Sequence, residues 1–385
     1  MRAARAALGA LLVLLTGAAC AAAAARPPDP LVRYQWHLAA IRAPSAWPVS
    51  RGAGVTVAVL DSGVAYEDRG PWRRAPDLSG TRFVPGWDFV DDDAHPDDVP
   101  PPSGRRSHGT QIATIIAATA GNGIGGAGVA PAAAIMPIRV LEPDLAGSAR
   151  AIARGLRFAA DHGADVANLS IAGRSPSKVL GDAIAYASAK GVTIVAASGN
   201  DGRDSVSWPA AYPRVIAVGA VDKGLRRAYY SNYGEALDLV APGGAGVAGD
   251  GGFGPADGVQ SQTIKGGRAD FCFCFMASTS AAAAQVSAVA ALVIGSGRAS
   301  RPAEVAALLR ASARDTGRPG RDVEHGAGLV QAAAAVGVPA PARGGTAAGE
   351  EPSRRWLLPG IAVAALAAAT AVGLGARRRR RAASG

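Results

Sequence analysis

A chain of 385 residues with 49% hydrophobic residues and 50 glycines can bury a large core, which excludes a mini-protein and favours one large domain with tails. Nine of the 40 basic residues flank apolar segments at the two chain ends, and they account for most of the net charge of +10. Without these nine, and without Glu350 and Glu351, 31 basic residues face 28 acidic ones. This balance excludes an extended nucleic-acid-binding surface.

The first 25 residues have the features of a signal peptide. Arg2 and Arg5 precede the apolar stretch 6–15, which is too short to span a bilayer, and several Ala-x-Ala cleavage sites follow before Arg26. Cys20 stands in a faint match to a lipoprotein cleavage box. We predict that residues 1–25 are removed and that the mature chain leaves the cytoplasm.

In residues 26–337, apolar runs of strand length alternate with helical patterns. The runs are rich in Val, Ile and Leu, as in strands buried on both faces, and they cover residues 55–60, 135–140, 164–170, 192–197, 215–221 and 237–241. Helical spacing covers residues 112–118, 149–162 and 177–190. We predict an α/β domain with a mostly parallel central sheet, whose functional residues gather at the carboxyl ends of the strands.

Three polar residues stand at element ends of this kind. Asp61 closes the first apolar strand, His108 opens a helical pattern, and Asn200 follows the strand 192–197. Taken one at a time, such residues are typical of solvated turns and helix starts. Their combination is what indicates a site.

Ser280 lies between an alternating apolar run that ends at Met276 and a buried, Ala-rich helical pattern. Unpaired N–H groups and the positive dipole end of such a helix would stabilise an anion beside the Ser280 hydroxyl. Ser278, Thr279 and Ser280 are also typical helix caps, which is the simpler interpretation of the segment alone.

The C-terminal part has the pattern of a membrane anchor. Residues 338–355 are rich in Pro and Gly and are predicted to form a linker. Residues 356–376 carry no charge and are long enough to span a hydrocarbon core of about 30 Å as a transmembrane helix. Residues 377–385 begin with five arginines, which predicts a basic cytoplasmic tail. A sorting signal whose hydrophobic segment is removed is the alternative.

Together, these residues supply the parts of nucleophilic catalysis. A serine nucleophile needs a base, the base needs an acid that holds its tautomer, and the oxyanion needs a donor. The chain order is Asp61, His108, Ser280. An α/β-hydrolase runs Ser, acid, His, and a chymotrypsin-like barrel runs His, Asp, Ser, so the order here is that of subtilisin.

From about Asp29 to Ala335, the chain resembles subtilisin-type serine endopeptidases, in the style of the thermitase-like branch. The matching motifs are VTVAVLDSGV, SHGTQIATIIAA, VAASGN and FMASTSAAAAQVSAVAAL. The resemblance implies a three-layer α/β fold with helices on both faces of the sheet. It also implies that Ser280 attacks the scissile carbonyl, His108 transfers the proton and Asp61 orients His108, while Asn200 donates to the oxyanion.

The same resemblance implies a groove that binds a protein or peptide substrate as an extended strand. Its edges would be formed by Leu145, Ala146, Gly147, Ser170, Ile171, Ala172 and Gly173. We expect no cofactor for catalysis. A structural Ca²⁺ is implied by Asp29, Asp77 and Asn122, although the loop 121–124 is about two residues short. The acidic residues Asp88, Asp91, Asp92, Asp93, Asp97 and Asp98 could hold a second ion, but we interpret them as a solvated loop.

Two departures from the family pattern affect the functional prediction. Ser278 stands where the family usually has glycine, whose backbone freedom a Cβ can block. The alternative is therefore a catalytically impaired scaffold that acts as a membrane-anchored binding or assembly protein. Only a few residues separate the signal peptide from the protease-like region, so we expect no pro-domain. We interpret Cys272 and Cys274 as replacements for aromatic core residues, without a disulfide bond.

The layout of signal peptide, protease domain and C-terminal anchor is shared with the mycosins, the membrane-anchored subtilases of mycobacterial secretion systems. This resemblance places the catalytic domain outside the cytoplasm, periplasmic or extracellular, and attaches it to the cell membrane. We predict a monomer.

Overall fold

The computed structural model describes residues 29–101, 106–245 and 257–339. Its contacts divide the chain into Met1–Ala340 and Pro341–Gly385, and all described residues belong to the first unit. The predicted signal peptide (1–25), transmembrane helix (356–376) and basic tail (377–385), with nearly all of the linker, lie outside the described residues. Within the described ranges, the helices are too short or too polar to cross a bilayer.

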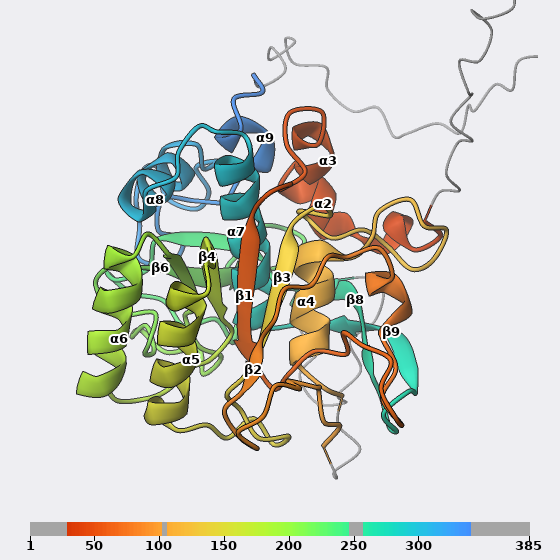
Figure 1. Cartoon of the computed structure of the whole chain (residues 1–385). Helices are drawn as coiled ribbons and strands as arrows, with labels where there is room; N and C mark the ends of the chain where they lie inside the picture. Colours follow the sequence, from red (N-terminus) through yellow and green to blue (C-terminus); the bar gives the residue numbers. More distant parts are fainter. Residues whose placement is uncertain (1–28, 102–105, 246–256, 340–385) are drawn as a thin grey trace, which may run out of the picture. The chain divides into compact units, whose positions relative to one another are not determined.

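A seven-stranded sheet forms the centre of the domain, and all of its strand pairs are parallel. The strand order is β2-β3-β1-β4-β5-β6-β7 (Figure 1). The strands are β1 (Thr56–Asp61), β2 (Trp87–Asp88), β3 (Ala134–Arg139), β4 (Val166–Leu169), β5 (Thr193–Ala197), β6 (Val215–Val221) and β7 (Leu239–Pro242). Every strand except β2 is buried along its whole length, as the continuous apolar runs predicted.

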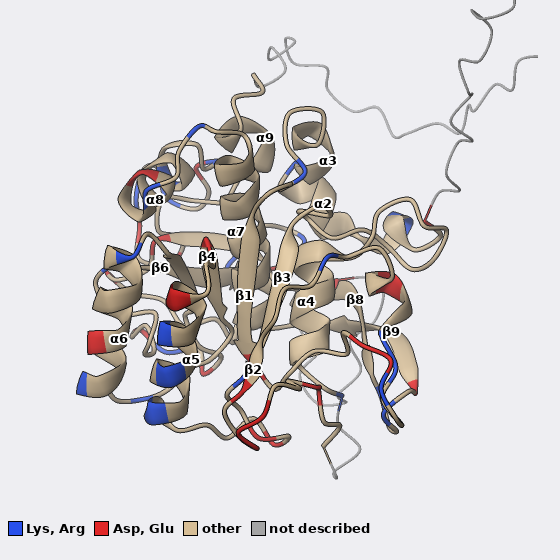
Figure 2. Ribbon diagram, in the orientation of Figure 1, with Lys and Arg blue, Asp and Glu red and all other residues tan. Residues whose placement is uncertain are grey.

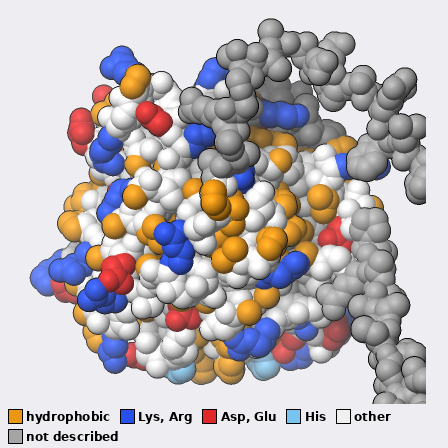
Figure 3. Space-filling model, turned by 90° about the horizontal axis from the view of Figure 1, so that it is seen from above, with side chains coloured by type: hydrophobic (Ala, Val, Ile, Leu, Met, Phe, Trp, Pro, Cys, Tyr) orange, Lys and Arg blue, Asp and Glu red, His pale blue; other side chains and the backbone are white. Residues whose placement is uncertain are grey.

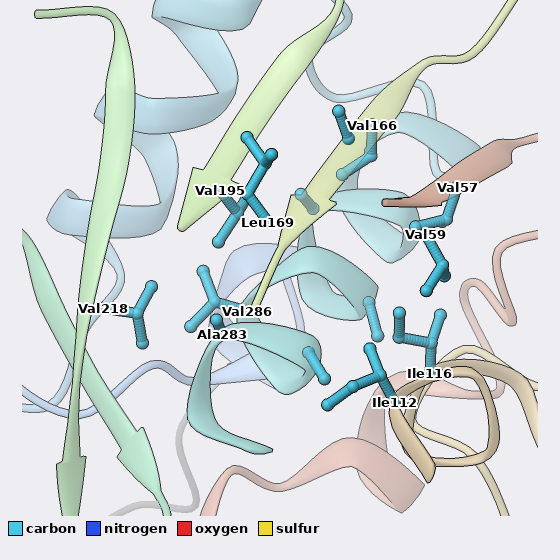
Figure 4. Close-up of a cluster of buried hydrophobic side chains, with 14 of the residues drawn as sticks. Val57, Val59, Ile112, Ile116, Val166, Leu169, Val195, Val218, Ala283 and Val286 are labelled. Atoms are coloured by element: carbon cyan, nitrogen blue, oxygen red, sulfur yellow. The ribbon is translucent and has the colours of Figure 1, made fainter. Parts of the chain in front are cut away.

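Helices cover both faces of this sheet. The helices α4 (Gly109–Ala117) and α7 (Thr279–Gly295) pack against the face on which Val57 and Val59 lie (Figure 4). The other face carries α5 (Ala149–Asp161) and α6 (Lys178–Ala189), and Gly155 of α5 lies beside Leu60. Because successive residues of a strand point to opposite faces, this alternation confirms the predicted three-layer α/β fold.

The central helix α7 is buried around its whole circumference from Thr279 to Val293. Most of its residues are Ala or Val, and a helix that is apolar on every side belongs in a protein interior. Its small side chains let it lie close to β4, β5 and β6. The buried helix predicted after Ser280 is confirmed.

The remaining elements surround this core (Figure 1). They are η1 (Val32–Tyr34), α2 (Trp36–Ala40), α3 (Ala43–Ala46), η2 (Pro76–Leu78), α8 (Pro302–Ala311), α9 (Ala332–Ala335) and the antiparallel hairpin of β8 (Val259–Ile264) and β9 (Phe271–Met276). Strand β9 ends only two residues before α7 begins, so the hairpin leads directly into the first turn of this helix.

Cys272 and Cys274 on β9 are joined by a disulfide bond, so the expectation of two unpaired cysteines was wrong. Residues two positions apart in a strand point to the same face. Their Cα atoms are 5.5 Å apart, a usual separation for a bridged pair. The bond therefore links neighbours on one face of the hairpin.

The interpretation of the acidic run as a solvated loop was only partly right. Figure 2 shows acidic residues gathered around the loop that follows β2, and residues 91–93 are exposed. Asp88, Asp97 and Asp98, however, are buried. Asp88 accepts a hydrogen bond from Arg139 at 2.7 Å, and Asp97 is paired with Arg69.

The end of the domain with α3, α8 and α9 shows apolar side chains interspersed with Lys and Arg (Figure 3).

Candidate active site

The buried Asp61 and the partly exposed His108 form a hydrogen-bonded pair. Asp61 is the last residue of β1, and His108 is the N-cap residue of α4. His108 Nδ1 lies 2.8 Å from Asp61 Oδ1 and 2.9 Å from Oδ2. The carboxylate can only accept, so it fixes the neutral imidazole as the tautomer with the proton on Nδ1. Nε2 then has the lone pair that a general base needs.

Ser280 occupies the first turn of α7, at the carboxyl edge of the sheet. Its Oγ lies 3.4 Å from the carbonyl oxygen of Ser170, the residue after β4, and Ser170 Oγ donates to the carbonyl of Ser280 at 3.2 Å. Ser170 Oγ also accepts from Asn168 Nδ2 at 2.9 Å, and Asn168 Oδ1 accepts from Ser287 at 2.9 Å. A chain of buried polar side chains thus connects β4 to α7 beside Ser280.

Asn200 follows β5 and is held by the residue that precedes Ser280. Its Oδ1 accepts hydrogen bonds from the main-chain N–H and from Oγ1 of Thr279, both at 2.9 Å. Because a main-chain N–H can only donate, these bonds assign the oxygen of the amide to Thr279. The Nδ2 donors point the other way, and Asn200 lines the same cleft as Ser280.

The loop that carries Asn200 depends on Gly199 and Asn232. Gly199 has a φ of +108°, and a Cβ there would lie 2.3 Å from Asn232 Nδ2. Asn232 Oδ1 accepts from the main-chain N–H groups of Asp201 and Arg203, each at 3.0 Å. Only glycine fits this position. Sequence reasoning did not assign roles to Asn168, Asn232 and Ser287, although a polar side chain inside an apolar run was the available signal for Asn168.

Ser278 does not disturb the site, contrary to the concern raised by its sequence. Its φ of −171° and ψ of 160° describe an extended backbone that any residue adopts. Its Oγ accepts from the main-chain N–H of Ala281 at 3.2 Å and so caps α7. The serine therefore replaces glycine without strain and satisfies one unpaired donor of the helix.

His108, Asn200 and Ser280 line a cleft of about 760 Å³. Of the predicted groove residues, Leu145, Ser170, Ile171 and Ala172 line this cleft, whereas Ala146, Gly147 and Gly173 are not among its lining residues.

Each of these three residues is engaged elsewhere. The Ala146 carbonyl accepts from the N–H of Glu142 at 2.8 Å, and Gly147 packs against Leu141. Gly173 exchanges two main-chain hydrogen bonds with Trp208, at 2.6 and 2.9 Å. The groove edge therefore includes Leu145 on one side and residues 170–172 on the other.

The three residues implied for calcium come together, but all of their side-chain oxygens except one already accept hydrogen bonds. Asp29 accepts from the N–H groups of residues 121–123 at 2.6 to 3.0 Å, and Asn122 Oδ1 accepts from Ile124 at 2.8 Å. Asp77 Oδ2 accepts from Gly126, so Oδ1 of Asp77 is the one carboxylate oxygen of the trio without a hydrogen-bond partner in the described structure.

Burial is the main cause that raises the pKa of Asp77 to about 7. Calcium takes six to eight oxygens, so this arrangement does not fit the ion. Among the described residues, no three His, Cys, Asp or Glu side chains gather as metal ligands.

Comparisons with known proteins agree with this geometry. Residues 52–328 match the Subtilase family. The chain is 40% identical over 203 residues to thermitase of Thermoactinomyces vulgaris, covering 53% of this chain and 68% of that protein. It is also 40% identical over 254 residues to the thermophilic serine proteinase of Bacillus sp. (strain AK1), covering 66% of this chain and 55% of that protein. A solved protease structure from Pseudoalteromonas arctica PAMC 21717 superposes with a TM-score of 0.70 at 32% identity, covering 81% of this chain and 98% of that one.

Proposed function

The chain belongs to the subtilase family of serine endopeptidases, and we propose that it cleaves peptide bonds with a triad of Asp61, His108 and Ser280. The observation that carries the proposal is the hydrogen-bonded pair of Asp61 and His108, which opens into the same cleft as Ser280. Ser280 also lies at the start of a long helix, where unpaired N–H groups favour negative charge.

In the proposed mechanism, Ser280 Oγ attacks the carbonyl carbon while Nε2 of His108 accepts its proton. The scissile C–N bond breaks as His108 returns that proton to the leaving amine, which leaves an acyl-enzyme. Water then attacks the acyl group through the same base and releases the carboxylate product. Asp61 keeps His108 in the required tautomer and stabilises the imidazolium ion. Asn200 Nδ2 donates to the oxyanion.

We propose that the substrate is an extended peptide segment along the groove edge. Ser170, Ile171 and Ala172 form one side, and Leu145 faces them from the loop after β3. Leu145 is 40% exposed and lines the cleft, so it offers an apolar side chain to a bound peptide. The small side chains of Ser170 and Ala172 in the same cleft leave room for an apolar substrate side chain.

The first test is covalent labelling of the full-length chain with a fluorophosphonate probe. The native chain is expected to be labelled, and Ser280→Ala is expected to lose the label. Ser296→Ala, at the other end of α7, is the matched control and keeps it. A folded native chain that stays unlabelled while Ser278→Gly is labelled would instead support the impaired-scaffold alternative.

We further propose that the enzyme is a membrane-anchored monomer with its catalytic domain outside the cytoplasm. The support is the uncharged segment 356–376 between basic residues, together with the signal-like segment 1–25. Membrane extraction at alkaline pH tests the anchor, and added protease on intact cells tests the orientation. A mature chain that lacks residues 356–385 by mass would favour the sorting-signal alternative.

A further inference from the structure

Asp98 is a fully buried carboxylate that accepts hydrogen bonds from the residue after Asp61 and from the second residue after His108. Its Oδ1 accepts the hydroxyl proton of Ser62 at 2.8 Å. Its Oδ2 accepts the main-chain N–H of Thr110, also at 2.8 Å. One carboxylate therefore joins the end of β1 to the start of α4.

Ser62 connects this carboxylate to both members of the pair. The N–H of Ser62 donates to Asp61 Oδ1 at 2.8 Å, and Ser62 Oγ accepts from the N–H of Gly109 at 3.0 Å. The Ser62 hydroxyl thus donates a hydrogen bond to Asp98 and accepts one from Gly109. A displacement of Asp98 would therefore change the positions of both Asp61 and His108.

Asp98 also takes the place of a helix cap. His108 is the N-cap residue of α4, yet its side chain makes no capping bond. The N–H of Thr110 is one of the first-turn donors that an α-helix leaves unpaired, and Asp98 satisfies it from a different segment. The negative carboxylate lies at the positive end of the helix dipole, which favours its ionised form.

The backbone around these bonds leaves no room for adjustment. A Cβ on Gly63 would lie 2.3 Å from the carbonyl oxygen of Asp97, and a Cβ on Gly109 would lie 2.0 Å from that of Gly63. The N–H of Val64 donates to the carbonyl of Pro96 at 2.9 Å. Three chain segments thus meet with main chain against main chain, and Asp98 supplies two of the side-chain bonds between them.

The charges around Asp98 make its bonds sensitive to protonation. Burial raises the pKa of Asp98 to about 7, hydrogen bonds from Thr110 and Ser62 lower it, and the charge of Asp61 raises it. The charge that raises the pKa of Asp98 is that of Asp61 on β1, which is itself hydrogen-bonded to His108 at the start of α4. The neighbouring Asp97 is paired with Arg69. A carboxylate accepts these bonds more strongly than a protonated carboxyl group does.

We propose that Asp98 is a positioning residue, whose carboxylate fixes the position of Asp61 relative to His108 by connecting Ser62 to the first turn of α4. The proposal rests on the proposed peptidase function, because this relative position matters only if His108 acts as the base. Asp98 acts through Ser62 and Thr110 and has no contact with substrate in this role.

The test compares Asp98→Asn with Asp97→Asn in the full-length chain. Asparagine keeps the shape of Asp98 and one acceptor, but it takes away the acceptor of the Ser62 hydroxyl. We expect kcat to fall by up to about 100-fold with little change in KM, as for a misplaced catalytic group. The acid limb of the pH profile of kcat should shift along the pH axis. The downfield NMR signal of the His108 Nδ1 proton should shift or broaden.

Asp97→Asn is the matched control, because it makes the same change at the adjacent buried carboxylate, which pairs with Arg69 instead. It should leave kcat, the pH profile and the His108 signal unchanged. An Asp98→Asn protein with native kcat, pH profile and His108 signal would overturn the proposal, even if it unfolds more easily.

If Asp98→Asn does not fold, Ser62→Ala tests the positioning role instead. It removes the hydroxyl that links Asp98 to Asp61 and keeps the hydrogen bond that Asp98 accepts from Thr110. A native kcat and His108 signal in Ser62→Ala would then reject the positioning role. If the native chain shows no peptidase activity, the proposed function fails separately. The His108 signal of the variants still reports on whether Asp98 positions the pair.

Discussion

Asn200 Oδ1 accepts two hydrogen bonds from Thr279, the residue immediately before Ser280. The amide is thereby oriented before any substrate arrives, with its N–H groups left for the cleft. Donors that are already in place lose little free energy to reorganisation during the reaction. The same two bonds also couple the loop after β5 to the first turn of α7.

Replacing Asn200 with Ala is expected to lower kcat by about 10²–10³ while KM changes little, because the donor acts mainly on the transition state. This magnitude is the one known for the corresponding asparagine of a subtilisin. Steady-state kinetics on a peptide substrate would measure it. Thr279→Val, which removes one of the two orienting bonds, should give a smaller loss, and an unchanged kcat in Asn200→Ala would contradict the oxyanion role.

The Asp61→Asn variant is expected to keep its fold and to lose about 10⁴ in kcat, because an amide at this position favours the wrong tautomer of His108. Fluorophosphonate labelling should slow in parallel. Asp165→Asn is a suitable control, since Asp165 accepts a main-chain N–H at the opposite end of β1. Activity within a few-fold of native in Asp61→Asn would argue against the triad.

Ser278 offers a direct test of the impaired-scaffold alternative. Because its backbone is extended and its hydroxyl caps α7, Ser278→Gly should leave kcat nearly unchanged and cost only a few tenths of a kcal/mol of stability. Ser278→Ala, which loses the cap, should cost about 1 kcal/mol. Chemical denaturation and kinetics on the same samples would measure both. A large gain of activity in Ser278→Gly would show that the serine restrains the enzyme.

The parallel sheet and the candidate catalytic residues could be predicted from the sequence for physical reasons. Strands buried on both faces appear as continuous apolar runs, and parallel strands place their carboxyl ends at one edge. Asp61, His108, Asn200 and Ser280 each stand next to such an element. Their chain order then distinguished this family from other serine hydrolases.

Asp98 and the Cys272–Cys274 bond were not accessible in the same way. Asp98 lies in an acidic run, and only its packing against Gly63 and its bonds to Ser62 and Thr110 remove it from solvent. These contacts are between segments far apart in the chain. The disulfide, by contrast, was missed because the two-residue period of a strand was applied wrongly.

The occupied oxygens of Asp29 and Asn122 predict that calcium contributes little to stability. Adding EGTA to the purified chain should leave the thermal unfolding midpoint unchanged, and adding back calcium should not raise it. Differential scanning fluorimetry measures both. A midpoint that falls with EGTA and recovers with calcium would mean that residues 121–124 rearrange to release ligands.

His37 predicts a specific dependence of stability on pH. It is fully buried on α2, and neither ring nitrogen has a hydrogen-bond partner within the described residues. Burial lowers the pKa of His37 from 6.5 to about 3, so the folded chain keeps the ring neutral while the unfolded chain protonates it. Stability is therefore lost as pH falls below 6.5, by about 1.4 kcal/mol per pH unit from this residue alone, until the folded pKa is reached.

The His37→Leu variant should remove this loss and also the cost of burying two unpaired nitrogens. The gain in unfolding free energy over the native chain is expected to grow as pH falls below 6.5, and urea denaturation at several pH values would measure it. Other titrating groups are common to both proteins and cancel in the difference. His162→Leu, at an exposed histidine, serves as the control. If the unfolding free energies of His37→Leu and the native chain change with pH in parallel, His37 takes up a proton in the folded state as readily as in the unfolded state. Water or a side chain would then have to reach its ring.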